Sequence, residues 1–402
     1  MFPAVLTMAT SRLNDVFKEV EQFTQFQRIL GMSAYIYSNG KFQVSRKWLI
    51  VSLINISGNL LIFIYTLHSI KKSLSKVSHW YSFLKTAYSL VLPCGIVASW
   101  IRSNRYLDLF NASLFKMRAV DLQLFSLGKV LPPTKPSWVT FLIFVLLLVA
   151  FFLKAPTMPT FLSCIQLLIL YAPYIHIISV EDIIDRIDSM LLLRFNALTM
   201  HLFQCTTMEA KKAANVLEKL ILCYDQLSSS SVDIDEYLGV QVISVLMLFF
   251  LASFCEIYAT SLMYRDDSLN YKGQLLVEKV LWIIVMIVIL SRVCHQFAAI
   301  TTEAKKFDML LYQLMIDDKT NNILNNPKLK LHTVMNRDVI FTAHDFLKLD
   351  YSLLHSMIAS SMTYLVIILQ FSKQQSSFDS NGVTSEFGNL TATAVPFVLT
   401  TV

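Results

Sequence analysis

Long stretches with few charges alternate along the chain with segments rich in charged residues. Seven such stretches are long enough to be membrane helices, and they cover residues 48–67, 80–101, 136–153, 155–180, 237–264, 275–302 and 351–372. A helix of about 20 apolar residues crosses the hydrocarbon core of a bilayer and pairs all its backbone groups internally. The pattern therefore predicts an all-α, seven-transmembrane-helix protein. Charged residues interrupt the second stretch at Lys85 and the sixth at Glu278, Lys279 and Arg292.

Two of the charged segments also show helical periodicity. Between 183 and 224, and again between 303 and 315, apolar residues recur three and four positions apart with charges between them. This spacing predicts amphipathic helices that continue the fourth and sixth spans. The apolar stripe either lies on a solvated face or packs on another helix or subunit, because it would otherwise form an exposed patch. Four serines at 228–231 predict a turn, and residues 321–327 predict a loop.

Composition agrees with a membrane protein. Hydrophobic residues make up 55% of the 402 residues and charged residues only 15%, against about 25% charge in an average globular protein. The chain has only nine glycines, which argues against Gly-rich phosphate-binding loops. No cleavable signal sequence is expected, since no basic region leads the mildly apolar start.

The distribution of basic residues gives the predicted helices a direction. Residues 1–47, 102–136, 181–236 and 299–349 hold 24 of the 34 Lys and Arg residues, and the opposite set of loops holds seven. Because cytoplasmic loops carry the excess of Lys and Arg, we expect a cytoplasmic N-terminus and an extracellular C-terminus. Asn389 starts a glycosylation tripeptide in the predicted outer tail. Similar tripeptides at Asn55 and Asn111, where modification is impossible, make this only modest support.

No enzyme is predicted. The sequence lacks GxSxG, Walker A, GxGxxG, HExxH and CxxC motifs, and no two of its eight histidines are spaced i, i+3 or i+4 for chelation. We therefore expect no catalytic residues, no metal site and no cofactor.

Charges inside membrane spans are costly and indicate function by default. Glu256 lies deep in the fifth span and either faces a cavity or partner, or bonds to another helix. We expect Lys85 and Lys279 to extend toward the outer surface and Arg292 toward the cytoplasmic surface.

The last span has one distinctive face. At 100° per residue this face carries hydroxyl groups in its inner part and apolar groups near its outer end, from Ser360, Thr363, Tyr364, Ile367, Gln370 and Phe371. If several copies surrounded an axis, Ile367 and Phe371 would form constrictions and Gln370 a polar ring, as in a gate that closes by dewetting. The alternative from spacing alone is an ordinary buried helix.

The end of this helix also carries a family motif. Thr363-Tyr364, five hydrophobic residues and Gln370-Phe371 resemble the TYhhhhhQF signature of insect gustatory receptors. Leu349-Asp350 with Leu353-Leu354, and Cys294-His295 with Glu303 and Lys305, resemble the sequences that precede it in the family. The likeness is specific over 290–371. This family is similar to the insect odorant receptors and their co-receptor, which form one chemoreceptor superfamily.

The resemblance implies a tetrameric ligand-gated, non-selective cation channel of the plasma membrane of gustatory sensory neurons. Its partners would be a small-molecule tastant, membrane lipid, permeant cations and other copies, as a homotetramer or a hetero-oligomer, and no nucleic acid. Ile367, Gln370 and Phe371 would line the pore and gate, while Thr363 and Tyr364 would pack at the helix junction. The implied organisation is a cytoplasmic N-terminus (1–47), six spans with extensions (48–302), an anchor segment (303–349), the pore helix (350–371) and an extracellular tail (372–402).

The resemblance also places a ligand pocket among the outer halves of spans two to six. Its aromatic and polar candidates are Trp80, Tyr81, Tyr88, Phe152, Gln166, Tyr171, Phe254, Glu256, Tyr258, Ser261, Trp282 and Met286. Leu365 follows Thr-Tyr where the main sugar-receptor group has an acid, which argues against that group. By resemblance, fructose-type and bitter-type receptors both accept an aliphatic residue there. The bitter type is expected because it is the larger set, with a fructose-type receptor as the alternative.

Two other classes of membrane protein are alternatives. A G-protein-coupled receptor would reverse the charge bias, and neither Asp-Arg-Tyr nor NPxxY is present. A transporter would favour repeats and broken helices, and nine glycines argue against it.

Overall fold

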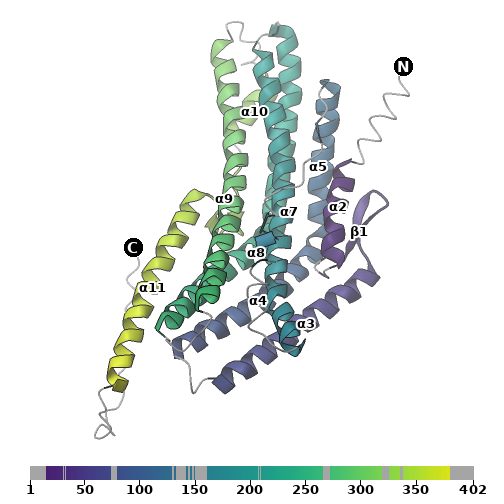
Figure 1. Cartoon of the computed structure of the whole chain (residues 1–402). Coiled ribbons are helices and arrows are strands. Elements are labelled where there is room, and N and C mark those ends of the chain that lie inside the picture. The colour runs from purple at the N-terminus through teal and green to yellow at the C-terminus, as the bar shows by residue number, and fades with distance from the viewer. Residues whose placement is uncertain are drawn as a thin grey trace, which may run out of the picture.

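The computed structural model describes residues 15–29, 31, 33–73, 79–128, 131–132, 142–143, 145–146, 149, 161–206, 208, 210–265, 272–318, 326–335 and 338–380. The described chain is mostly helical, with two short hairpins (Figure 1). The elements in order are α2 (Asp15–Ile29), β1 (Tyr35–Ser38), β2 (Lys41–Val44), α3 (Arg46–Ser73), α4 (His79–Arg105), α5 (Leu107–Ser126), α7 (Phe161–Cys205), α8 (Ala210–Arg265), α9 (Lys272–Asp317), α10 (Pro327–Met335), β3 (Thr342–Ala343), β4 (Leu347–Lys348) and α11 (Tyr351–Ser380).

Three long helices, α7, α8 and α9, form the centre of the molecule and pack on one another along their length (Figure 1). The 56 residues of α8 correspond to a length of about 84 Å at 1.5 Å per residue. The core follows these helices and takes in α4 and α5, with fully buried aromatic side chains such as Tyr224, Phe195 and Phe307. Helix continues from the fourth and sixth predicted spans into the charged segments, as the periodicity predicted.

The serines at 228–231 do not form the predicted turn, because α8 runs through them without a break. The hydroxyl of Ser231 donates to the Leu227 carbonyl oxygen at 2.9 Å, which satisfies it within the helix. The hydroxyls of Ser230 and Ser113 are 2.6 Å apart, and Lys116 Nζ donates to Ser229 Oγ at 2.8 Å. Small hydroxylated side chains here join α8 to α5 rather than turning the chain.

The segment before the first predicted span folds against the main core. The Asn39-Gly40 turn, with φ values of 52° and 79°, joins β1 and β2 in a two-residue hairpin, for which this dipeptide is favoured. Phe42 is 1% exposed. Its backbone N–H donates to Asn111 Oδ1 at 2.8 Å, and Asn111 Nδ2 donates back to its carbonyl oxygen at 3.0 Å. This edge is therefore fixed to α5, a contact that the hydrophobic pattern did not predict.

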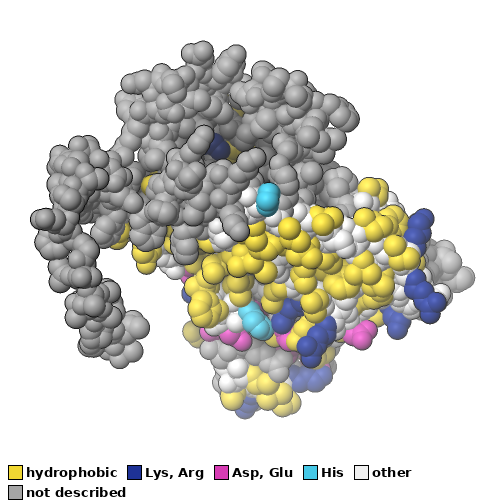
Figure 2. All heavy atoms as spheres, turned by 90° about the horizontal axis from the view of Figure 1, so that it is seen from below, with side chains coloured by type: hydrophobic (Ala, Val, Ile, Leu, Met, Phe, Trp, Pro, Cys, Tyr) yellow, Lys and Arg dark blue, Asp and Glu magenta, His cyan; other side chains and the backbone are white. Residues whose placement is uncertain are grey.

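Six of the predicted spans overlap described helices: α3, α4, α7, α8, α9 and α11. Most of the third, 136–153, lies outside the described residues. Among the described residues, two helical segments are long and apolar enough to cross a membrane, Ala213–Cys255 and Lys279–Asp317. The face seen from below carries many hydrophobic side chains over its described part, with Lys and Arg at the edge (Figure 2). Much of this surface is therefore apolar, as contact with lipid or another chain would require.

Candidate functional site

The start of α11 is fixed by a side-chain cap and by contacts with α9. Asp350 Oδ1 accepts bonds from the backbone N–H and hydroxyl of Ser352 at 2.9 and 2.5 Å. It also accepts the N–H of Leu353 at 3.3 Å, the arrangement expected of an aspartate N-cap. The ring nitrogen Nδ1 of His295, on α9, is hydrogen-bonded to the hydroxyl of Tyr351. Helix α11 then continues along α8 and α9, which hold its inner side.

The predicted face of α11 is open in the single chain. Tyr364 is 53% exposed and Ile367 39% exposed, and both Thr363 and Gln370 are exposed. Ser361, which points into the subunit, is only 7% exposed. An apolar and hydroxylated surface therefore lies beside the contact with α8 and α9. The side chain of Phe371 lies outside the described part.

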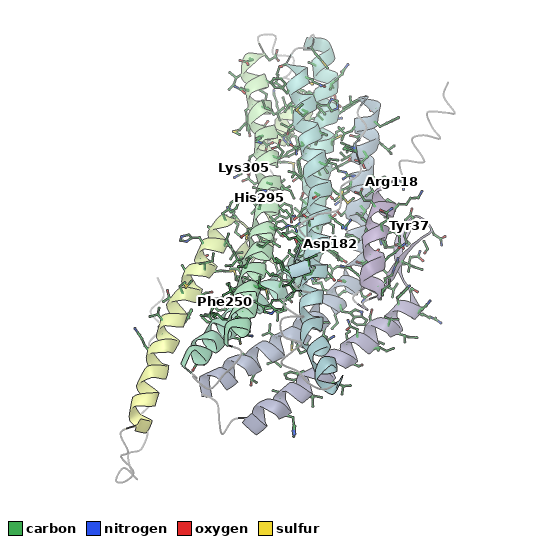
Figure 3. The ribbon with its side chains drawn as sticks, in the orientation of Figure 1. Tyr37, Arg118, Asp182, Phe250, His295 and Lys305 are labelled. Atoms are coloured by element: carbon green, nitrogen blue, oxygen red, sulfur yellow. The ribbon has the colours of Figure 1, made fainter. Side chains whose placement is uncertain are left out.

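An aromatic cluster joins α11 to α8. The ring of Tyr364 is 6.0 Å from Phe254 and 6.4 Å from Phe250, in edge-on geometry. Phe250 and Phe254 are themselves 4.7 Å apart at 85°, and Tyr258 is fully buried beside them. Figure 3 places Phe250 on the lower part of α8, close to α11. Edge-on pairs of this kind stabilise a contact beyond the area they bury, so movement of this part of α8 is mechanically linked to Tyr364.

A small apolar cavity of about 10 Å³ lies between α7, α8 and α9. Its lining is entirely hydrophobic: Ile177, Ile184, Val242, Val245, Leu246, Phe249, Met286, Ile289, Leu290 and Val293. Phe249 directly precedes Phe250, so the cavity and the aromatic cluster occupy neighbouring positions of α8. This volume is no more than one water molecule requires, so the three helices are closely packed here.

A buried group of charges lies between α7 and α9. Arg292 is 3.0 Å from a carboxylate oxygen of Glu181 and 2.8 Å from one of Asp185. The amide of Gln296 also donates to Asp185. Arg292, predicted to extend toward the cytoplasmic surface, pairs with two carboxylates of the segment predicted to be cytoplasmic, and its side chain is 15% exposed. Its depth in a membrane stays a prediction. Burial, with Asp185 and Asp235 nearby, raises the pKa of Asp188 well above its usual value.

A second polar contact holds the segment that leads into α11. Asp235, on α8, accepts the backbone N–H of Thr342 and the hydroxyl of Thr342, each at 2.9 Å. Gly239 lies one turn further on, where an added Cβ would meet the His344 nitrogen at 3.0 Å. The β3–β4 hairpin therefore touches the backbone of α8 directly.

A family model described as 7tm chemosensory receptor matches residues 23–375. The chain belongs to this family. No curated protein sequence matched it.

Solved structures share the fold of this chemosensory receptor. The insect olfactory receptor OR5 from Machilis hrabei is 13% identical, with a TM-score of 0.63, and the match covers 90% of this chain and 100% of that one. The same receptor in complex with eugenol is 11% identical, with a TM-score of 0.58 and the same coverage. At these identities the likeness concerns the fold, including the long helices on which the site is built.

The receptor brings together only some of the predicted ligand-pocket residues. Phe254 and Tyr258 belong to the cluster beside α11, Met286 lines the apolar cavity, and Trp282 is 4% exposed in the main core. The remaining candidates have no described side chain: Trp80, Tyr81, Tyr88, Phe152, Gln166, Tyr171, Glu256 and Ser261. Lys85 and Asn389 also lie outside the described side chains, whereas Lys279, expected to extend outward, is only 9% exposed.

Several residues of the site were missed by sequence reasoning. Phe250 is one helical turn before Phe254, so an aromatic pair spaced i, i+4 was the available signal. Glu181 and Asp185 have the same i, i+4 spacing just after the fourth predicted span. This spacing places two acids on one face of a helix. Asp235 gave no such signal, because its partner lies 107 residues away.

Proposed function

We propose that this chemosensory receptor is an insect gustatory receptor that assembles as a tetramer and forms a ligand-gated, non-selective cation channel. The supporting observation is the open face of α11, where Ile367 is 39% exposed beside the buried Ser361. Copies of α11 around an axis would cover this face and bring Ile367 and Gln370 to the centre. The motif from Thr363 to Phe371 favours the gustatory branch of the family.

In this proposal a hydrophobic constriction closes the pore. Rings of apolar side chains expel water from a narrow channel and stop ions without a physical plug. Ile367 and Phe371 are the constricting residues, and Gln370 provides a polar ring between them. Opening then requires α11 to move away from the axis, and its contact with Phe250 and Phe254 on α8 transmits such a movement.

The ligand is proposed to be a small, mostly apolar tastant, of the bitter type, with a fructose-type sugar as the alternative. Leu365 follows Thr363-Tyr364 where the main sugar-receptor group carries an acid, which argues against that group. The related olfactory receptor was solved in complex with eugenol, a small molecule. We place the receptor in the plasma membrane of gustatory neurons, with the basic segments and the N-terminus in the cytoplasm.

Electrical recording tests the proposal. The chain is expressed alone in cells, and currents are recorded while plant alkaloids and sugars are applied with G-protein signalling blocked. A ligand-evoked cation current that persists under the block is the expected result. Loss of every response under the block would support the G-protein-coupled alternative and overturn the channel.

Matched variants locate the gate. Ile367→Ala is expected to raise the leak current or to shift the ligand response, because it widens the proposed constriction. Met362→Ala is the control, since Met362 is also an exposed apolar residue of α11 but lies about 140° around the helix from Ile367. Equal effects of the two variants, with equal surface expression, would remove Ile367 from the gate.

A further inference from the structure

Helix α3 turns polar residues toward the protein and aliphatic residues away from it. Ser52 and Asn59 are buried, and Asn59 Nδ2 donates to Asn55 Oδ1 at 2.9 Å. The exposed aliphatic side chains, called here the aliphatic stripe, are Ile50, Leu53, Ile54, Leu60, Leu61 and Ile64. At 100° per residue the stripe covers an arc of about 120°, and its centre lies about 150° around the helix from Ser52 and Asn59.

This arrangement suits contact with hydrocarbon. A helix on the surface of a water-soluble protein turns its aliphatic side inward, whereas the inner side of α3 is the one that contacts α4 and α2. Helix α3 lies at the lower end of the molecule in Figure 1, the end that Figure 2 shows from below with many hydrophobic side chains. From Ile50 to Ile64 the stripe is about 21 Å long, enough to follow an acyl chain through the roughly 15 Å of hydrocarbon in one leaflet.

The same face begins with two basic residues. Arg46 and Lys47 are the first residues of α3, and both are exposed. Viewed down the axis, Arg46 lies near the centre of the stripe and Lys47 at its edge. The first turn of α3 has no acid, and within the described residues neither side chain pairs with a carboxylate. Glu21 of the adjacent α2 is engaged by Arg28 and by the Tyr37 N–H.

Trp48 indicates the level at which these charges lie. The Nζ of Lys47 is 5.5 Å from the centre of the Trp48 ring, and the guanidinium carbon of Arg28 is 6.0 Å from it. Tryptophan is enriched where a membrane meets water. The charge distribution predicts that this end of α3 is cytoplasmic, and the cytoplasmic leaflet carries the anionic lipids. Two cations without a carboxylate partner therefore lie at the level of negative headgroups.

We propose that Arg46, Lys47 and the aliphatic stripe form a surface that binds anionic phospholipid in preference to zwitterionic phospholipid. The negative headgroup lies against the two cations, and an acyl chain follows the stripe. A zwitterionic lipid makes the same apolar contact but gains no net charge attraction. One basic residue near an anionic surface is worth about fivefold in binding, so a preference of at least about fivefold is expected. Because salt screens exposed charges, the preference is expected to fall as salt is added.

Photoactivatable lipids test this surface directly. Full-length protein is placed in nanodiscs of phosphatidylcholine and phosphatidylglycerol in equal parts, with a trace of either lipid carrying a diazirine in its acyl chain. Mass spectrometry then compares the labelling of residues 46–64 by the two probes. Stronger labelling by phosphatidylglycerol, which weakens with salt, is the expected result. Equal labelling would show ordinary hydrocarbon contact and overturn the proposal. Labelling by neither probe, with crosslinks to a second copy, would show that protein covers the face and would also overturn it.

Variants separate charge from apolar contact. Arg46→Gln combined with Lys47→Gln is expected to bring the two probes to nearly equal labelling, with phosphatidylcholine labelling unchanged because the stripe is intact. Arg46→Lys combined with Lys47→Arg keeps both charges and should keep the preference.

Lys219→Gln combined with Lys330→Gln is the matched control. It removes two exposed charges beside an ion pair between α8 and α10, and α10 lies at the opposite end of the molecule from α3 (Figure 1). An unchanged preference in the Arg46 and Lys47 glutamine variant, or an equal loss in the control, overturns the proposal. If the glutamine variant does not fold, the wild type decides, because a preference that does not respond to salt overturns the proposal as well. None of these results depends on channel activity.

Discussion

His332 holds the short helix α10 to the two long helices beside it. Its Nδ1 is 3.0 Å from an oxygen of Asp225 on α8, and its Nε2 is 3.5 Å from an oxygen of Asp308 on α9. The ring also packs edge-on against Tyr224 at 5.1 Å, and Tyr224 donates to Asp308 at 2.8 Å. Burial alone would lower the pKa of His332, but Asp225 and Asp308 outweigh it and raise the pKa to about 9.

This shift predicts how the attachment of α10 depends on pH. The folded pKa is higher than the unfolded value of 6.5, so the stabilisation is complete below pH 6.5 and is lost as pH rises through 9. The full shift corresponds to at most about 3.4 kcal/mol at 1.36 kcal/mol per unit. The side chain of Asp225 is 37% exposed and that of Asp308 24%. Solvent screening therefore reduces the expected stabilisation to about 2 kcal/mol.

Hydrogen exchange of α10 measures this effect. Peptides spanning 327–335 are followed in purified protein from pH 6.5 to 9.5, after correction for intrinsic exchange rates. Wild-type protection is expected to fall steeply across this range. His332→Gln is expected to start with lower protection and to change little with pH. Lys328→Gln is the control on the same helix, because its ion pair with Glu218 is exposed on both sides and contributes little.

Two outcomes would contradict this explanation. Protection of wild-type α10 that is constant from pH 6.5 to 9.5 would mean that His332 does not carry a charge-dependent contact. A parallel decline in wild type and His332→Gln would assign the pH dependence to another group.

Further predictions concern α8 and α9. Arg292→Gln leaves Glu181 and Asp185 buried without their cation and should destabilise the protein by about 3–5 kcal/mol; a melting temperature within a few degrees of wild type would contradict this. Asp235→Ala removes both bonds to Thr342 and should increase hydrogen exchange at the Thr342 amide by roughly tenfold, whereas unchanged exchange would show that the hairpin is held elsewhere. Burial raises the pKa of Asp235 to about 6, so its contribution to stability is greatest below pH 4 and is lost as pH rises through 6. Asp235→Asn should reduce the change of the melting temperature with pH between pH 4 and 6.

The helices were the most predictable part of the molecule. Apolar residues recur three and four positions apart in 183–224 and 303–315, which predicted helix. In the structure, α7, α8 and α9 cover most of these two segments. The face of α11 around Ile367 could also be derived, because one helix fixes the angular relation of its own residues. Both predictions depend only on residues that are close together in the sequence.

Contacts between distant segments were not predictable in this way. The ion pairs of Arg292 were not predicted, because its partners Glu181 and Asp185 lie on another helix, α7. The hairpin at Asn39-Gly40 had a local turn signal, but its attachment to Asn111 depends on how α5 returns to it. The serines at 228–231 resembled a turn because serine bonds well to irregular backbone. In the structure these hydroxyls instead bond to residues of α5 or to the backbone of α8 itself.

Helix α8 contacts both the hairpin that precedes α11 and α11 itself. Asp235 holds the hairpin before α11, Phe249 lines the small apolar cavity, and Phe250 touches α11 itself. These residues lie within a few turns of one unbroken helix, and an α-helix resists bending over so short a length because each turn is hydrogen-bonded to the next. Displacement of this part of α8 would therefore also displace a support of α11. The two supports, at Asp235 and at Phe250, differ in chemistry, so substitution at each can separate loss of the hairpin from loss of the aromatic contact.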